Sequence, residues 1–269
     1  LTQQQVAFFN TFGFLKLPAL MRDDIEEITS EFEAVFTDKG VRHEKDQRTC
    51  IVPFADSRAK LCALLDDPRI EGAAASILGE DFNYLGSDGN YYVGDTNWHS
   101  DGFHRVGRYI KIAFYLDPVR ESTGALRVIP TTHHVPNHDA SKVYLAPDAH
   151  SNWGIEGAEV PCVALESQPG DVLMFDHNLM HAAYGGSNQR RMFTLNLCKR
   201  VETEDEFTDL KGYIASNARF WIDHMHGPIM RETATASRQV HLQQVIDNEG
   251  HLAKLSAEAR AAQVEPARG

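Results

Sequence analysis

Apolar residues near the start of the chain recur with helical spacing. Thr2 is followed three positions later by Gln5, which is the pattern of a capping box, so a helix is predicted to begin there. Gly13 can end this helix, because glycine readily adopts the left-handed conformation common at helix C-termini. The apolar residues that follow predict a short strand at 14–17.

A clearer amphipathic helix is predicted to begin at Asp23 or Asp24 and to end before Gly40. Its apolar positions fall on one stripe, which contains Ile25, Ile28, Phe32, Val35 and Phe36. A third helical pattern covers 61–78. We therefore interpret residues 1–80 as a helical support that packs against the rest of the chain.

The pattern changes between residues 82 and 200, where short apolar runs are separated by Gly, Pro and Asn. These runs predict strands at 82–85, 90–93, 109–116, 125–129, 160–165, 171–175 and 191–197. Many short strands with polar turns indicate a sandwich or barrel rather than alternating βαβ units. Helical spacing returns over 201–269, where Thr203 and Glu206 form another capping box. With no repeat and no low-complexity linker, residues 1–269 are predicted to be a single domain.

Composition excludes several classes of function. A hydrophobic content of 42% allows a buried core and does not indicate disorder. The formal net charge of −12 would be repelled by phosphates, so neither nucleic acid nor an anionic membrane is an expected partner. No apolar run approaches the ~20 residues of a membrane span, and no signal peptide is recognised. The four cysteines are scattered without a C-x-x-C pair, which favours reduced thiols in a cytoplasmic protein.

The stretch at 98–102, which reads Trp-His-Ser-Asp-Gly, carries the clearest chemistry. On an extended segment His99 and Asp101 point to the same face, because side chains alternate along a strand. A distant histidine, His181, can complete a set of two imidazoles and one carboxylate, which is the facial triad of non-haem iron(II) oxygenases. His177 lies four residues earlier and is the alternative third ligand.

Four motifs, in the same order, resemble those of the phytanoyl-CoA dioxygenase-like branch of the iron(II)/2-oxoglutarate oxygenases. They are the His-x-Asp motif at 98–101, Thr-Gly-Ala-Leu-Arg-Val-Ile-Pro-Thr-Thr-His at 123–133, Pro-Gly-Asp-Val-Leu-Met-Phe at 169–175 leading to Met-His at 180–181, and Gln-Arg-Arg-Met-Phe-Thr-Leu at 189–195. Thr123 stands where the family usually has Asn, and Thr131-Thr132 replace Gly-Ser, which changes turns and not the chemistry. The resemblance implies a mainly β fold, a double-stranded β-helix or jelly roll with flanking N- and C-terminal helices.

The resemblance also implies roles for individual residues. The histidine, aspartate and histidine named above would bind iron, and an arginine near the end of the barrel would hold the distal carboxylate of 2-oxoglutarate, since a guanidinium matches a carboxylate bidentately. Arg190 and Arg191 compete for this role. Strand alternation puts Arg190 on a mixed polar face and Arg191 on an otherwise apolar face, which favours Arg190. Asn90 lies where relatives place a co-substrate contact.

Two further groups of residues have open interpretations. His104, Arg105, Arg108 and Lys111 closely follow the triad, and a basic run beside the metal could receive an anionic substrate. The alternative is that they pair with surface carboxylates such as Glu121. The histidines within 133–138 could suggest a second metal, but in the family this segment is a turn with a structural histidine.

These features predict an enzyme that uses Fe(II), 2-oxoglutarate and O2 to hydroxylate an aliphatic C–H of a small polar or anionic metabolite, such as an aminoalkylphosphonate or similar zwitterion. The carboxylate of Asp101 favours hydroxylation over halogenation, because halogenating relatives have Gly or Ala at this position. A cupin-type metal enzyme that does not use 2-oxoglutarate and a catalytically silent binding member of the fold are the alternatives. The oligomeric state, monomer or homodimer, stays open.

Overall fold

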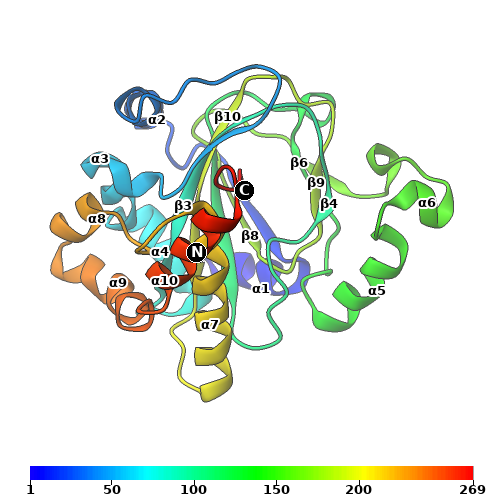
Figure 1. The fold of residues 1–269 in the computed structure, drawn as a ribbon. Helices are drawn as coiled ribbons and strands as arrows, with labels where there is room; N and C mark the ends of the chain where they lie inside the picture. Colours follow the sequence, from blue (N-terminus) through cyan, green and yellow to red (C-terminus); the bar gives the residue numbers. More distant parts are fainter. Residues whose placement is uncertain (269) are drawn as a thin grey trace.

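The computed structural model describes residues 1–268 and has two facing antiparallel sheets at its centre (Figure 1). The larger sheet has the strand order β1-β8-β5-β10-β3-β2, and the smaller one has the order β4-β9-β6-β7. The strands are β1 (Phe14–Leu17), β2 (Thr49–Ile51), β3 (Asn83–Tyr92), β4 (Thr96–His99), β5 (Tyr109–Tyr115), β6 (Leu126–Val128), β7 (Val163–Leu165), β8 (Val172–Asp176), β9 (His181–Ala183) and β10 (Arg190–Cys198). The predicted jelly-roll class is confirmed.

Alternation along β10 separates the two faces of the large sheet. Phe193 and Leu195 belong to the core between this sheet and the N-terminal helices, and Phe193 stacks on Phe114 with ring centroids 4.5 Å apart. Met192 belongs to the core between the two sheets, together with Leu126 from the small sheet. One face of β10 therefore packs under helices, and the other faces the interior between the sheets.

The helices α3, α4, α8, α9 and α10 gather on the side of the large sheet, and α5 and α6 lie beyond the small sheet (Figure 1). The helices are α1 (Gln3–Phe12), α2 (Ile25–Asp38), α3 (Ala59–Cys62), α4 (Pro68–Leu78), α5 (Val135–Leu145), α6 (Ala149–Trp153), α7 (Glu204–Ser216), α8 (Pro228–Glu232), α9 (Ala236–Asn248) and α10 (Leu252–Ala262), with short 3-10 turns η1 (Ala55–Ser57), η2 (Ala63–Leu65), η3 (Glu121–Thr123), η4 (Gly157–Glu159) and η5 (Asn217–Phe220). Both predicted capping boxes are present, at Thr2 and Thr203. No helix of the described chain is long and apolar enough to cross a membrane.

Several elements differ from the pattern-based expectations. The predicted helix at 61–78 is divided, because Asp67 caps a new helix whose first residue is Pro68. Helices α5 and α6 occupy a segment where no element was predicted, and α5 has little amphipathic character to reveal it. The predicted strands at 82–85 and 90–93 are one continuous strand, β3. The short strands β4 and β9 were not predicted.

Candidate active site

The two short strands that were not predicted bring the three expected metal ligands together. β4 pairs with β9 so that His99 and His181 are direct register partners. Asp101 follows two residues after His99, and its Oδ2 lies 3.7 Å from Nε2 of His181. One ligand atom from each of the three residues lies within 4.8 Å of the others, which is a spacing that one metal ion can bridge.

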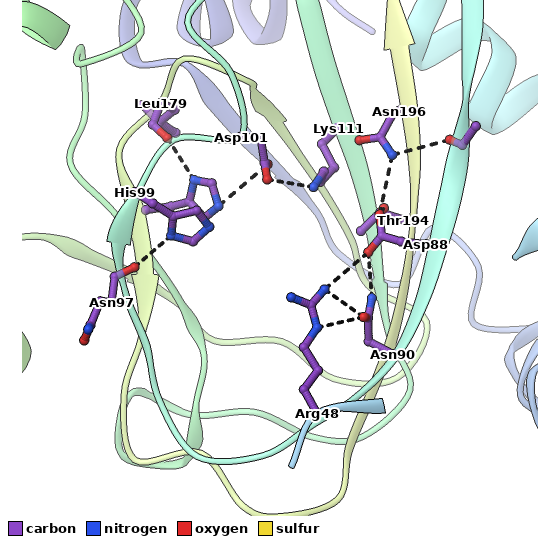
Figure 2. A network of polar contacts seen from close by, with 12 residues as sticks. Arg48, Asp88, Asn90, Asn97, His99, Asp101, Lys111, Leu179, Thr194 and Asn196 are labelled. Carbon is purple, nitrogen blue, oxygen red and sulfur yellow. Dashed lines mark hydrogen bonds and ion pairs between the residues drawn. The ribbon is translucent and has the colours of Figure 1, made fainter. Parts of the chain in front are cut away.

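Backbone carbonyls fix the orientation of both imidazoles. Nδ1 of His99 lies 2.7 Å from the carbonyl oxygen of Asn97, and Nδ1 of His181 lies 2.9 Å from that of Leu179 (Figure 2). A proton on each Nδ1 donates to its carbonyl and leaves the Nε2 lone pair free for a metal. Burial lowers the pKa of His181 to about 3, so this imidazole is neutral near pH 7, as a metal ligand must be.

Asp101 is held by a cation that is mostly buried. Nζ of Lys111, on β5, lies 2.9 Å from Oδ1 of Asp101 (Figure 2). Burial alone would raise the pKa of Asp101, but Lys111, which is the strongest opposing influence, and the neighbouring histidines together keep the pKa below its usual range. The carboxylate is therefore ionised, and a set of two imidazoles and one carboxylate suits iron(II).

His177, the alternative third ligand, lies next to the group of His99, Asp101 and His181 but is not part of it. The side chain is buried and lines the same cavity, and neither ring nitrogen has a hydrogen-bond partner within residues 1–268. Its ring packs against His104, with centroids 5.7 Å apart. Among the described residues, the group with metal-ligand spacing contains His181 and not His177, and it contains none of the histidines of 133–138.

The cavity in front of the candidate ligands has a volume of about 740 Å³. One wall is the inner face of β3 and β10, including Asp88, Thr194 and Asn196. The opposite wall carries His99 and His181 from the small sheet. Residues of α7 and η5, such as Tyr213 and Phe220, complete the lining, so the C-terminal region forms part of this site.

Arg190 and Arg191 lie on opposite faces of β10, as strand alternation predicts. Arg190 is 3% exposed and lines the cavity, and its Nε and Nη1 have no hydrogen-bond partner within the part of the chain that the structure describes. Its guanidinium lies 5.2 Å from the ring centroid of Tyr92. Arg191 faces outward and is occupied by Asp117 and Glu33, at 2.6 and 2.7 Å. A buried cation with unused donors is a ready partner for a carboxylate that enters the cavity.

Asn90 is buried on the inner face of β3, but its amide is already engaged. Its Oδ1 accepts hydrogen bonds from Nε and Nη2 of Arg48, at 2.9 and 2.7 Å, and its Nδ2 donates to Asp88 at 2.6 Å. Asn90 does not belong to the cavity lining found among the described residues, whereas Arg48 does. In Figure 2 the remaining guanidinium nitrogen of Arg48 points into the open space between this wall and the histidines. The geometry therefore gives Asn90 a supporting position behind Arg48, in place of the direct contact we expected.

The basic run after the triad does not enter the cavity as a unit. His104 and Lys111 line it, and Nδ1 of His104 lies 2.7 Å from Asp209 on α7. Arg105 has a side chain 60% exposed and pairs weakly with Asp139. Arg108 donates to Asn10 at 2.7 Å. The expected grip on an anionic substrate by Arg105 and Arg108 is not supported, because both guanidinium groups are directed to surface partners.

The sequence analysis missed one cavity residue, Arg48, and assigned another, Lys111, to the wrong group. Arg48 precedes β2, an edge strand too short to be recognised, and only the tertiary fold brings it to Asn90. Lys111 was grouped with the basic run, although a lysine flanked by Ile110 and Ile112 in an apolar strand signals a buried partner. The spacing of residues along the chain does not reveal that Asp101 is the partner of Lys111.

A family model for phytanoyl-CoA dioxygenase (PhyH) matches residues 9–193, which is more than half of the chain. The chain belongs to the phytanoyl-CoA dioxygenase family. This membership confirms the predicted enzyme class, a non-haem oxygenase that uses iron(II) and 2-oxoglutarate. The match ends within β10, so α7 and η5, which line the cavity, lie beyond it. No curated protein sequence matches the chain.

Solved structures of low sequence identity share the fold. The non-haem alpha-ketoglutarate-dependent carbocyclase SnoK from nogalamycin biosynthesis has 18% identity and a TM-score of 0.59, and the match covers 74% of this chain and 84% of SnoK. EctD from S. alaskensis, solved with 2-oxoglutarate and 5-hydroxyectoine, has 24% identity and a TM-score of 0.58 over 75% of this chain and 78% of EctD. HygX from Streptomyces hygroscopicus, solved with nickel and 2-oxoglutarate, has 16% identity and a TM-score of 0.58 over 76% of this chain and 89% of HygX.

Proposed function

We propose that this family member hydroxylates an aliphatic C–H bond of a small polar or anionic metabolite, with iron(II) held by His99, Asp101 and His181. The observation that carries the proposal is the convergence of these three side chains from two paired strands and one loop onto a common point. Three protein ligands would leave positions on the iron open for 2-oxoglutarate and dioxygen.

Arg190 is proposed to hold the distal carboxylate of 2-oxoglutarate. Its guanidinium is buried in the cavity with unused donors, and a bidentate charged pair would satisfy them. Arg191 cannot serve, because Asp117 and Glu33 occupy it on the other face of the strand. This buried, unpaired arginine also argues against a cupin-type enzyme that does not use 2-oxoglutarate.

Iron(II) with 2-oxoglutarate and dioxygen supplies oxidative decarboxylation to succinate and CO2, with one oxygen atom passed to the substrate C–H. The contribution of the chain is positioning and exclusion of water. Backbone carbonyls orient His99 and His181, Lys111 orients Asp101, and side chains of α7 and η5 line part of the cavity. The complete ligand set argues against a catalytically silent member of the fold.

The charges of the cavity favour a substrate with an anionic group. Arg48, Lys111, Arg190 and Arg219 contribute four positive charges, and Asp88 and Asp101 contribute two negative charges, which leaves two net positive charges. Iron(II) and the 2-oxoglutarate dianion add charges that cancel. Inside a cavity of low dielectric constant this remaining charge is best neutralised by a carboxylate, phosphate or phosphonate on the substrate.

Arg48 is the proposed contact for that group. It is fixed by two hydrogen bonds to Asn90 and lies 4.2 Å from the ring centroid of Tyr92, and Figure 2 shows its free edge turned toward the open space. The acidic partner Asp88 keeps the wall polar, so a zwitterion such as an aminoalkylphosphonate fits the same surroundings. Because the region after residue 200 supplies part of this cavity, we also propose that residues 1–269 act as one domain.

The test is turnover of 2-oxoglutarate, read as succinate, with pairs of small metabolites that differ by one anionic group. The anionic member of an accepted pair should stimulate turnover, and Arg48→Met should lower that stimulation at least tenfold at limiting substrate, because a hydrogen bond to a charged group contributes about 1.5–3 kcal/mol. Arg105→Met is the matched control, since Arg105 lies outside the cavity. Equal loss in both variants, or preference for the uncharged members, would refute the substrate assignment.

A further inference from the structure

Lys111 is an unusual residue for its place in the fold. It lies on β5, in the middle of the large sheet, with Asn196 as its register partner on β10. Its neighbours Ile110 and Ile112 belong to the apolar core on the other face of the sheet. Lys111 itself points to the cavity, and its side chain is only 14% exposed. A lysine is rarely buried unless a specific partner offsets the cost of desolvation.

The partner of Lys111 is one carboxylate oxygen of Asp101, a proposed metal ligand. Nζ of Lys111 lies 2.9 Å from Oδ1 of Asp101, whereas Oδ2 of Asp101 is the oxygen that lies 3.7 Å from Nε2 of His181. The two carboxylate oxygens are therefore directed to different groups. Oδ2 faces the ligand set, and Oδ1 faces the ammonium group (Figure 2).

We infer that Lys111 is a positioning residue that reserves Oδ1 of Asp101, so that Asp101 binds the metal through Oδ2 alone. The inference rests on the proposed metal ligands. A carboxylate free to turn can bind a metal through both oxygens, and then it takes two positions instead of one. Three protein ligands and a bidentate 2-oxoglutarate fill five of six positions, so a second oxygen from Asp101 would fill the position that dioxygen needs. Lys111 keeps that position open.

The chain offers a matched control for this pair. Lys16, on β1, lies 3.0 Å from Oδ2 of Asp171 and is also partly buried, but it lies outside the cavity. Replacing either lysine by methionine removes one ammonium group from one carboxylate and keeps an unbranched side chain that is one atom shorter. A general effect of losing a lysine–aspartate pair would appear in both variants, whereas an effect on metal coordination would appear only at Lys111.

The decisive experiment uses the iron(II)- and 2-oxoglutarate-loaded protein without oxygen, with nitric oxide as the probe for the dioxygen position. Wild-type protein and Lys16→Met should bind nitric oxide and give the electron paramagnetic resonance signal of an iron–nitrosyl centre. Lys111→Met should give at most a tenth of that signal at the same nitric oxide concentration. Lys111→Met should also bind iron(II) or cobalt(II) more tightly than Lys16→Met, because both oxygens of Asp101 become available to the metal and the competing ammonium group is gone.

Lys111→Arg, which keeps a cation able to donate to Oδ1, should restore part of the nitrosyl signal. If Lys111→Met does not fold, Lys111→Gln carries the same comparison, since it removes the charge and keeps a polar group in the cavity. A nitrosyl signal and metal affinity in the uncharged variant equal to those of Lys16→Met would overturn the inference. If the wild-type protein neither retains iron nor consumes 2-oxoglutarate, the proposed function fails instead, so the two failures are distinguishable.

Discussion

Replacement of Arg190 by methionine should weaken 2-oxoglutarate binding and, in the absence of the co-substrate, stabilise the protein. Hydrogen bonds to a charged group contribute about 1.5–3 kcal/mol. Since 1.4 kcal/mol is a factor of ten, losing them corresponds to a roughly 10- to 150-fold higher dissociation constant. The stabilisation follows from the burial of the Arg190 side chain. Nε and Nη1 of Arg190 have no partner among residues 1–268, and a buried donor without a partner destabilises a fold by about 1–3 kcal/mol.

The assay is calorimetric titration of 2-oxoglutarate into the nickel(II)-loaded protein, which cannot turn over, together with thermal unfolding of the metal-free protein. Arg191→Met is the matched control, one residue away on the same strand. Its ion pairs with Asp117 and Glu33 are partly exposed, so losing them should cost about 1 kcal/mol or less and leave 2-oxoglutarate binding unchanged. A larger loss of binding in Arg191→Met than in Arg190→Met would show that the assignment of the strand faces is wrong.

Three further outcomes are expected. Gly124→Ala should weaken 2-oxoglutarate binding more than Gly94→Ala in the same titration. Both glycines have positive φ, so both substitutions strain the backbone. A Cβ at Gly124 would overlap the Arg190 guanidinium, whereas a Cβ at Gly94 would meet no described atom within 4 Å. Metal analysis should show that His181→Ala loses iron and His177→Ala retains it, and the opposite result would reassign the ligand. Burial lowers the pKa of His226 to about 4. Below about pH 6.5 the unfolded chain therefore takes up a proton that the folded protein excludes, and the free energy of unfolding decreases as the pH falls from about 6.5 to about 4. Denaturant unfolding of His226→Phe should reduce this pH slope by up to about 1.4 kcal/mol per unit, and an unchanged slope would contradict the argument.

The sequence predicts those parts of the fold in which local signals agree. The capping box at Thr2 and the apolar stripe of α2 act within one or two turns, and both are present. The alternation of β10 was equally readable, so the opposite placement of Arg190 and Arg191 followed from spacing alone. The His-x-Asp pair is likewise local, and one later histidine was enough to complete the candidate site.

The missed elements depend on contacts between distant residues. The middle of β3 contains Gly86 and Gly89, which indicate a turn in isolation, but a Cβ at Gly89 would overlap the ring of Phe54. Glycine is needed there for close packing, and not for a reversal of the chain. The same applies to Arg48, whose place in the cavity depends on its pairing with Asn90, 42 positions later in the chain. The spacing of residues along the chain does not predict such contacts.

The cavity is built from two stretches of chain that can change independently. The candidate metal ligands and Arg190 lie within residues 9–193, whereas Tyr213 and Phe220 come from the contiguous stretch formed by α7 and η5. An exchange of that stretch alone would replace one wall in a single genetic step, while the chemistry on the sheets stayed intact. Chimeras joined just after Cys198, at the end of β10, are therefore a direct way to transplant selectivity between relatives of this fold.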